Sequence, residues 1–260
     1  VTGLDSNTGA ITVSTPLSKD YQVEYYPPGG NSTNSVTTLN NTGPAAELSV
    51  SKCPSMPSGL RIANLHIDHS TNCWATISGA YLKDLTLENV TADADGRFLS
   101  LSAWYRGSMS GCNIHILANT NTNDVTRWWF TTAWGSSDVD CVDNTFSADY
   151  YAWVHVNEGS VRCRVLRNSI TAAPGFNANN QALVNYANRG YSCVIQDNII
   201  RNPSTSPGGA GIRIGASSSW PGLKYRNSVV DGNTIYGGYA SIIDNSTTGV
   251  TSPRGNVWVP

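Results

Sequence analysis

The sequence predicts an all-β fold in which short strands repeat along the chain, and three observations lead to this prediction. A four-residue segment recurs at 143–146, 167–170, 197–200 and 232–235, with Asn in second place and a large apolar residue in fourth place. The asparagines are 24, 30 and 35 residues apart, and strand-like segments precede and follow them. Apolar residues elsewhere follow a period of two, whereas Gly, Asn and Thr interrupt every candidate helix. A segment that recurs every 24 to 35 residues is typical of proteins built from stacked repeats.

The recurrent Asn predicts a sharp turn between two short strands. Asn tolerates left-handed backbone, and its amide group caps nearby backbone groups. If the repeats stack as coils, each Asn is also expected to hydrogen-bond to the next. With these features the chain resembles the right-handed parallel β-helix proteins of the pectate-lyase-like superfamily, in which an asparagine ladder lines one tight turn. The resemblance covers roughly residues 60–243 and concerns architecture, not activity.

The resemblance implies a right-handed, single-stranded parallel β-helix, a solenoid of about seven or more coils. The first strands of seven coils are expected at 61–67, 82–87, 109–116, 139–146, 163–170, 193–200 and 229–235. In the first three coils we expect Leu65, Leu85, and either Cys112 or Ile114, at the ladder position. The expected organisation is strands, loops or irregular first coils over 1–57, the β-helix over 58–245, and a tail or last partial coil over 246–260.

Composition narrows the classes of partner. Charged residues make up 13% of the chain and the net charge is −2, so the basic face that nucleic acid requires is not expected. No apolar run reaches membrane-spanning length, which predicts no membrane insertion. The six cysteines include no CxxC pair; this favours buried free thiols over zinc, with disulfides as the open alternative. Cys163 and Cys193 each precede their Asn by five residues, so we expect them at equivalent positions on adjacent coils.

No cofactor and no metal site are predicted. His66 and Asp68 are expected to face one way while His69 lies in a turn, and the sequence offers no fourth ligand nearby. Calcium-binding pectate lyases of the superfamily carry clustered Asp on their functional strands. The corresponding strands here carry Thr, Ser, His and Asn, so the resemblance does not imply calcium.

The second strands of the coils predict a polar and aromatic outer face. Side chains alternate across a strand, which assigns one outer row and a neighbouring aromatic row. The polar row is expected to hold Thr76, Ser100, Thr131, His155, Asn185 and Arg213, and the aromatic row Trp74, Phe98, Trp129 and Trp153. Aromatic faces beside hydrogen-bonding groups suit sugar rings. We therefore expect Trp129, Trp153, Thr131 and Asn185 to bind substrate, unless the rings pack beneath loops or in a subunit contact.

Four residues are candidates for catalysis: His155, Glu158, Asp149 and Arg213. His155 is a candidate general acid or base, and Arg213 a candidate for binding an acidic sugar. Glycoside hydrolysis requires two carboxyl groups, which Glu158 with Asp149 or Asp124 would supply across neighbouring coils. The alternatives are structural: His155 binds a loop, Arg213 forms a salt bridge with Asp244, and the carboxylates end turns.

The first strands predict a ladder of surface ion pairs. Asp143, Arg167 and Asp197 occupy the same place in successive repeats, and opposite charges one rung apart attract each other. A structural role for this row is favoured over catalysis.

In its low Lys content and its Trp-rich polar face, the chain resembles a bacteriophage tailspike. This resemblance implies a homotrimer on the virion tail, extracellular at the host surface. It also implies binding of bacterial surface polysaccharide (O-antigen or capsule) and its depolymerisation by glycoside hydrolysis or β-elimination. The alternatives are a non-catalytic, carbohydrate-binding adhesive β-helix and a secreted polysaccharide lyase that acts as a monomer.

Overall fold

The chain divides into two compact units, Val1–Pro54 and Ser55–Pro260. The computed structural model describes residues 3–4, 11–12, 58–69, 76–80, 82–94, 97–117, 129–149, 153–157, 160–172, 182–187, 190–201, 210–214, 225–238, 240–244 and 255–260, with the backbone alone for several strand residues. In the first unit, β1 (Gly3–Leu4) pairs antiparallel with β2 (Ile11–Thr12).

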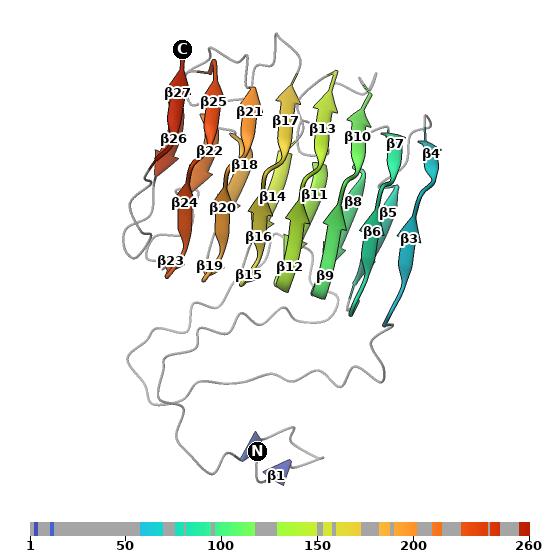
Figure 1. The fold of residues 1–260 in the computed structure, drawn as a ribbon. Coiled ribbons are helices and arrows are strands. Elements are labelled where there is room, and N and C mark those ends of the chain that lie inside the picture. Colours follow the sequence, from blue (N-terminus) through green and yellow to red (C-terminus); the bar gives the residue numbers. More distant parts are fainter. Residues whose placement is uncertain are drawn as a thin grey trace, which may run out of the picture. The chain divides into compact units, whose positions relative to one another are not determined.

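The described part of the second unit consists of three parallel sheets (Figure 1). The ten-stranded sheet contains β3 (Arg61–Ala63), β6 (Thr86–Glu88), β9 (Tyr105–Ser110), β12 (Ser137–Val142), β15 (Ser160–Val161), β16 (Arg164–Leu166), β19 (Gly190–Tyr191), β20 (Val194–Gln196), β23 (Tyr225–Arg226) and β24 (Val229–Asp231). The eight-stranded sheet contains β4 (His66–His69), β7 (Thr91–Ala94), β10 (Asn113–Ile116), β13 (Thr145–Ala148), β17 (Ser169–Ala172), β21 (Ile199–Arg201), β25 (Thr234–Tyr236) and β27 (Val257–Val259). The seven-stranded sheet contains β5 (Ile77–Ala80), β8 (Leu99–Ser102), β11 (Trp129–Trp134), β14 (Trp153–Asn157), β18 (Ala182–Ala187), β22 (Ala210–Ile214) and β26 (Ala240–Asp244).

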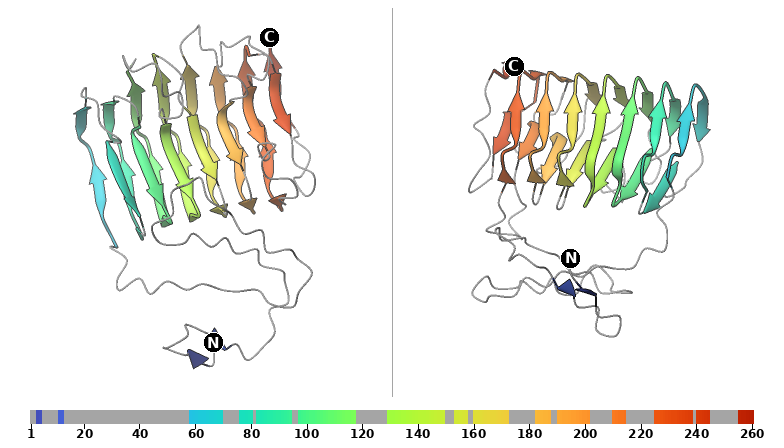
Figure 2. Two further views of the ribbon diagram at one scale, coloured as in Figure 1. Left: turned by 180° about the vertical axis from the view of Figure 1, so that it is seen from behind. Right: turned by 60° about the horizontal axis from the view of Figure 1, so that its bottom comes forward.

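The chain passes through these sheets in a constant order: ten-stranded, eight-stranded, seven-stranded. Each strand pairs with its equivalents in the preceding and following repeats, as β10 does with β7 and β13. Both views of Figure 2 show the strands stacked in sequence order. The predictions of an all-β fold and of parallel strands are confirmed for the described part of the second unit. Within the described ranges, no helix is long and apolar enough to cross a membrane.

The apolar residue of the recurrent segment forms a column in the core. Phe146, Ile170, Ile200 and Ile235 are direct neighbours on successive strands of the eight-stranded sheet, and each is fully buried. Because successive side chains of a strand point to opposite faces, the residues on either side of each apolar residue lie on the outer face.

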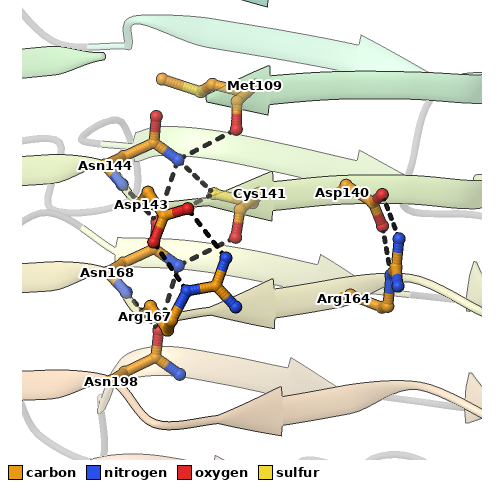
Figure 3. Close-up of polar contacts among 9 residues, drawn as sticks. All are labelled: Met109, Asp140, Cys141, Asp143, Asn144, Arg164, Arg167, Asn168 and Asn198. Atoms are coloured by element: carbon orange, nitrogen blue, oxygen red, sulfur yellow. Dashed lines mark hydrogen bonds and ion pairs between the residues drawn. The ribbon is translucent and has the colours of Figure 1, made fainter. Parts of the chain in front are cut away.

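The recurrent asparagines form a buried ladder (Figure 3). The backbone N–H and Nδ2 of Asn144 both donate to Oδ1 of Asn168, at 3.0 and 2.9 Å. Asn168 donates in the same way to Asn198, and Asn198 to Asn233. Each Nδ2 also donates to a carbonyl of the repeat before its own, as Asn168 does to Cys141 at 2.9 Å. The predicted hydrogen bonding between successive asparagines is confirmed.

The structure corrects three details of the ladder. The left-handed residue is the one before each Asn, as in Arg167 with φ of 53°, whereas the Asn side chain bonds to the repeats on either side. Leu65 and Cys112 hold the ladder position as predicted, and Val90 holds it in the repeat between them, since each carbonyl accepts the equivalent backbone hydrogen bond. Leu85, predicted there, instead holds the position of Cys163 and Cys193, because its carbonyl accepts the equivalent backbone hydrogen bond, from Ser108. Asn256 adds a rung, accepting from Asn233 at 3.0 and 2.8 Å.

The described cysteines are free and buried, as the sequence favoured for them. Cys112, Cys141, Cys163 and Cys193 form no disulfide. The carbonyl groups of Cys163 and Cys193 accept the equivalent backbone hydrogen bonds, from Val194 and Val229. These two residues therefore stack on adjacent repeats, which confirms their predicted equivalence. Cys53 and Cys73 lie outside the described residues.

Candidate functional site

The predicted polar row lies on the seven-stranded sheet. His155 of β14 is the register partner of Asn185 of β18, and Asn185 is the register partner of Arg213 of β22. The inner neighbours Val154, Val184 and Ile212 are 0–1% exposed. Since strand residues alternate between faces, the three polar positions share the outer face. The predicted alignment of these three positions on neighbouring strands is confirmed.

A β-bulge in β11 changes the neighbours of His155. Trp129 is the partner of Trp153, as predicted, but the register shifts between Trp129 and Thr131. Thr131 is consequently opposite the buried Val154, and Thr132 is opposite His155. The prediction that Thr131 neighbours His155 is wrong because the bulge inserts one residue, and an insertion of one residue exchanges the two faces of a strand.

The row also differs from the prediction in the first strands of the seven-stranded sheet, β5 and β8. Ser78, rather than Thr76, is opposite Ser100; the shift of two residues preserves the face. Phe98 was predicted on the outer aromatic row and is fully buried. It precedes β8 by one residue, so strand alternation does not fix its direction, and burial of its ring stabilises the fold. Trp74 lies outside the described residues.

The predicted catalytic residues come from different parts of the structure. Glu158 and Asp124 lie outside the described residues. Asp149 follows β13 in the eight-stranded sheet, where its Oδ1 is 3.3 Å from Nε2 of His115. Arg213 has a half-buried position. Its partner on β26 is Ile243, and Asp244 is opposite Ile214.

A second polar cluster lies on the outer face of the eight-stranded sheet, and the sequence analysis missed it. Nδ1 of His115 is 2.9 Å from Oγ of Ser147, and its Nε2 contacts Asp149. The signal was the segment Ser147-Ala148-Asp149, in which a hydroxyl and a carboxylate share one face of a strand. The partner histidine is 32 residues earlier, a separation that has meaning only once the register is known.

The same arrangement occurs two repeats earlier in a looser form. Nδ1 of His66 is 2.9 Å from Oγ1 of Thr91, whereas its Nε2 is 3.9 Å from Oδ2 of Asp93. The segment Thr91-Ala92-Asp93 again places a hydroxyl and a carboxylate on one face. His69, predicted in a turn, is the last residue of β4. Among the described side chains, no three of the types His, Cys, Asp and Glu are grouped so as to hold a metal ion.

The ion pairs of the ten-stranded sheet join its successive repeats. Arg167 donates from Nε and a terminal nitrogen to the two carboxylate oxygens of Asp143, both at 2.8 Å (Figure 3), which confirms that predicted pair. Two further bidentate pairs link the same two repeats, Arg162 with Asp138 and Arg164 with Asp140. Bidentate geometry fixes the guanidinium against the carboxylate, so three pairs hold β12 against β15 and β16 and the turns beside them.

These pairs predict a loss of stability in acid. Hydrogen bonds from Arg162 and Arg167 lower the pKa of Asp138 and of Asp143 below the ordinary value. A carboxyl group with a lower pKa in the folded state contributes stability above its unfolded pKa, about 3.9, and loses it as pH falls toward the folded pKa. We expect the urea midpoint to fall between pH 5 and pH 2. The fall should be smaller in Arg162→Gln plus Arg167→Gln than in the wild type, and equal falls would contradict the prediction.

Searches for similar proteins returned no match to the chain among protein-family models, curated proteins or solved structures.

Proposed function

We propose that the second unit is a right-handed parallel β-helix that binds and cleaves bacterial surface polysaccharide, in the manner of a bacteriophage tailspike. The architectural part is supported by the constant order of the three parallel sheets and by the buried ladder from Asn144 to Asn256. Repeats that stack in register offer rows of side chains with a regular spacing of about 4.8 Å. Such rows suit a polymer of repeating sugars.

Binding is assigned to the outer face of the seven-stranded sheet. Trp129 and Trp153 are register partners, and the polar row through His155, Asn185 and Arg213 begins two residues after Trp153. Aromatic rings stack on the C–H faces of sugars, while amide and guanidinium groups bond hydroxyl and carboxylate groups. Thr132, the neighbour of His155, takes the place first assigned to Thr131.

The row favours β-elimination over hydrolysis. Its members Thr132, His155, Asn185, Arg213 and Ile243 include no carboxylate, whereas hydrolysis of a glycosidic bond uses two. Elimination from a uronic acid needs a base to remove the proton next to the sugar carboxylate and a cation to stabilise the charge that develops there. We assign His155 as the base. Arg213, two strands away at roughly 9.6 Å, binds the carboxylate with its long side chain.

The single observation that carries this proposal is the register that joins His155, Asn185 and Arg213. The test is incubation with purified capsular and O-antigen polysaccharides, followed by assays for unsaturated uronate and for new reducing ends. Both signals are expected. His155→Ala should lower kcat by about 10²-fold or more, the usual contribution of a general base, and Trp153→Ala should weaken binding. His66→Ala is the matched control, because His66 lies on the eight-stranded sheet.

The other possible results each indicate an alternative function. Reducing ends without unsaturation would indicate hydrolysis and would make Glu158, with Asp149, the residues to replace next. Binding without either product would indicate an adhesive, non-catalytic protein. Unchanged binding in Trp129→Ala and Trp153→Ala would remove this face from the proposal. We also propose a homotrimer on the virion tail; a monomeric mass in solution would favour a secreted lyase.

A further inference from the structure

We propose that Ser147, His115 and Asp149 form a separate hydrolytic site for carboxylic esters on the eight-stranded sheet, with Ser147 as the nucleophile. The site does not depend on the polysaccharide face, because it uses β10 and β13 and the residue that follows β13. The side chains of His115 and Asp149 are partly exposed, so the site can reach an ester carried on a large molecule.

The hydrogen-bonding capacity of each group determines which atom donates and which accepts in the two contacts of His115. A carboxylate only accepts hydrogen bonds, so Nε2 of His115, 3.3 Å from Oδ1 of Asp149, is assigned the imidazole hydrogen. Nδ1 is then an acceptor, and the hydroxyl of Ser147, at 2.9 Å, donates to it. A serine hydroxyl that donates to an imidazole held by a carboxylate has the arrangement of an activated nucleophile.

The sheet holds the three groups in place. His115 and Ser147 are direct register partners, and the backbone N–H of Asp149 donates to the carbonyl of Ile116 at 2.9 Å. The inner neighbours Ile114 and Phe146 are fully buried, which fixes the outward direction of the residues beside them. The side chains of His115 and Asp149 are 31% and 51% exposed, so a substrate has access to them.

The flanking residues complete the site. Thr171 of β17 is the register partner of Ser147 on the side away from His115. One strand spacing, about 4.8 Å, brings its hydroxyl beside the nucleophile, where it can donate to the oxyanion of an attacked carbonyl. Asp93 is the register partner of His115 on the opposite side, and it contacts His66. The cluster of His66, Thr91 and Asp93 has a longer contact to its carboxylate and serves as an internal comparison.

The proposed ester hydrolysis needs only the side chains of Ser147 and His115 and a water molecule. Oγ of Ser147 forms a bond to the acyl carbon while its proton passes to Nδ1 of His115. The ester C–O bond breaks, and the leaving alcohol takes that proton. A water molecule then attacks the acyl-serine with His115 as base, the acid is released, and the proton returns to Oγ of Ser147.

The test uses the full chain, a fluorophosphonate probe and p-nitrophenyl acetate. We expect the probe to label Ser147, as identified by peptide mass spectrometry, and labelling to be lost in His115→Ala. Ester hydrolysis should fall at least about 10²-fold in Ser147→Ala and in His115→Ala, and by a smaller factor in Thr171→Val. Ser169→Ala is the control, because Ser169 lies on the neighbouring strand in a different row. Circular dichroism should show the same fold for all variants.

Two results would overturn the proposal. An exposed imidazole hydrolyses activated esters without a serine; if His115→Ala loses activity while Ser147→Ala keeps it, Ser147 is not a nucleophile. If the probe labels no residue above the level of Ser147→Ala, the cluster is a structural contact between two strands. Neither result bears on cleavage of polysaccharide, which is assayed separately through His155→Ala.

Discussion

Asn168→Ala should lower the free energy of unfolding by about 3 kcal/mol or more, since each buried polar group left without a partner costs about 1–3 kcal/mol. The change removes the acceptor of the backbone N–H of Asn144, at 3.0 Å, and of its Nδ2, at 2.9 Å. It also removes the donor to the carbonyl of Cys141 and one donor to Oδ1 of Asn198. Asn144, Asn168 and Asn198 are 0–2% exposed, so water does not replace these bonds.

Urea unfolding at pH 7 measures this effect, and Asn113→Ala is the matched control. Asn113 is an exposed asparagine of β10, and its replacement should change stability by no more than about 0.5 kcal/mol. Equal stabilities of the two variants would show that the ladder contributes nothing beyond ordinary turn formation.

Gly107→Ala should destabilise the fold by about 3 kcal/mol, at the upper end of the cost of overpacking a core. A Cβ at this position would lie 1.7 Å from Nε1 and 2.0 Å from Cε2 of Trp104. Trp104 is 1% exposed, so its ring cannot move outward without loss of packing. Gly107 is opposite Val139, a buried residue; the indole of Trp104 occupies the space that a side chain fills in the next repeat.

A double-mutant cycle tests this explanation. Trp104→Ala alone is expected to cost about 3–5 kcal/mol through the cavity it leaves. In that background, Gly107→Ala should be neutral or stabilising, because the added methyl group enters the cavity. Ser108→Ala, the neighbouring half-exposed position, is the control. If the two changes are additive, the cost at Gly107 comes from the backbone and not from the indole, since coupling appears only between groups in contact.

The predicted site was partly accessible from sequence. The row of His155, Asn185 and Arg213 could be predicted because side chains alternate between the two faces of a strand. The three strands also pair at these residues without an inserted residue. Thr131 was misplaced because a bulge leaves no pattern of its own in the residues around it. The cluster of His115, Ser147 and Asp149 was missed because its members come from two repeats, and only the paired backbones show which residue is opposite which.

By itself, the sequence determined the parallel strands, the asparagine ladder and the buried column from Phe146 to Ile235, because each repeat carries the same short pattern and stacking brings like residues together. The tertiary structure alone decided the register at β11, the burial of Phe98 and the contact of His115 with Ser147. The physical reason is that strand faces alternate with a period of two residues. A single inserted residue, or a connection of different length, therefore changes which side chains meet without changing the local pattern.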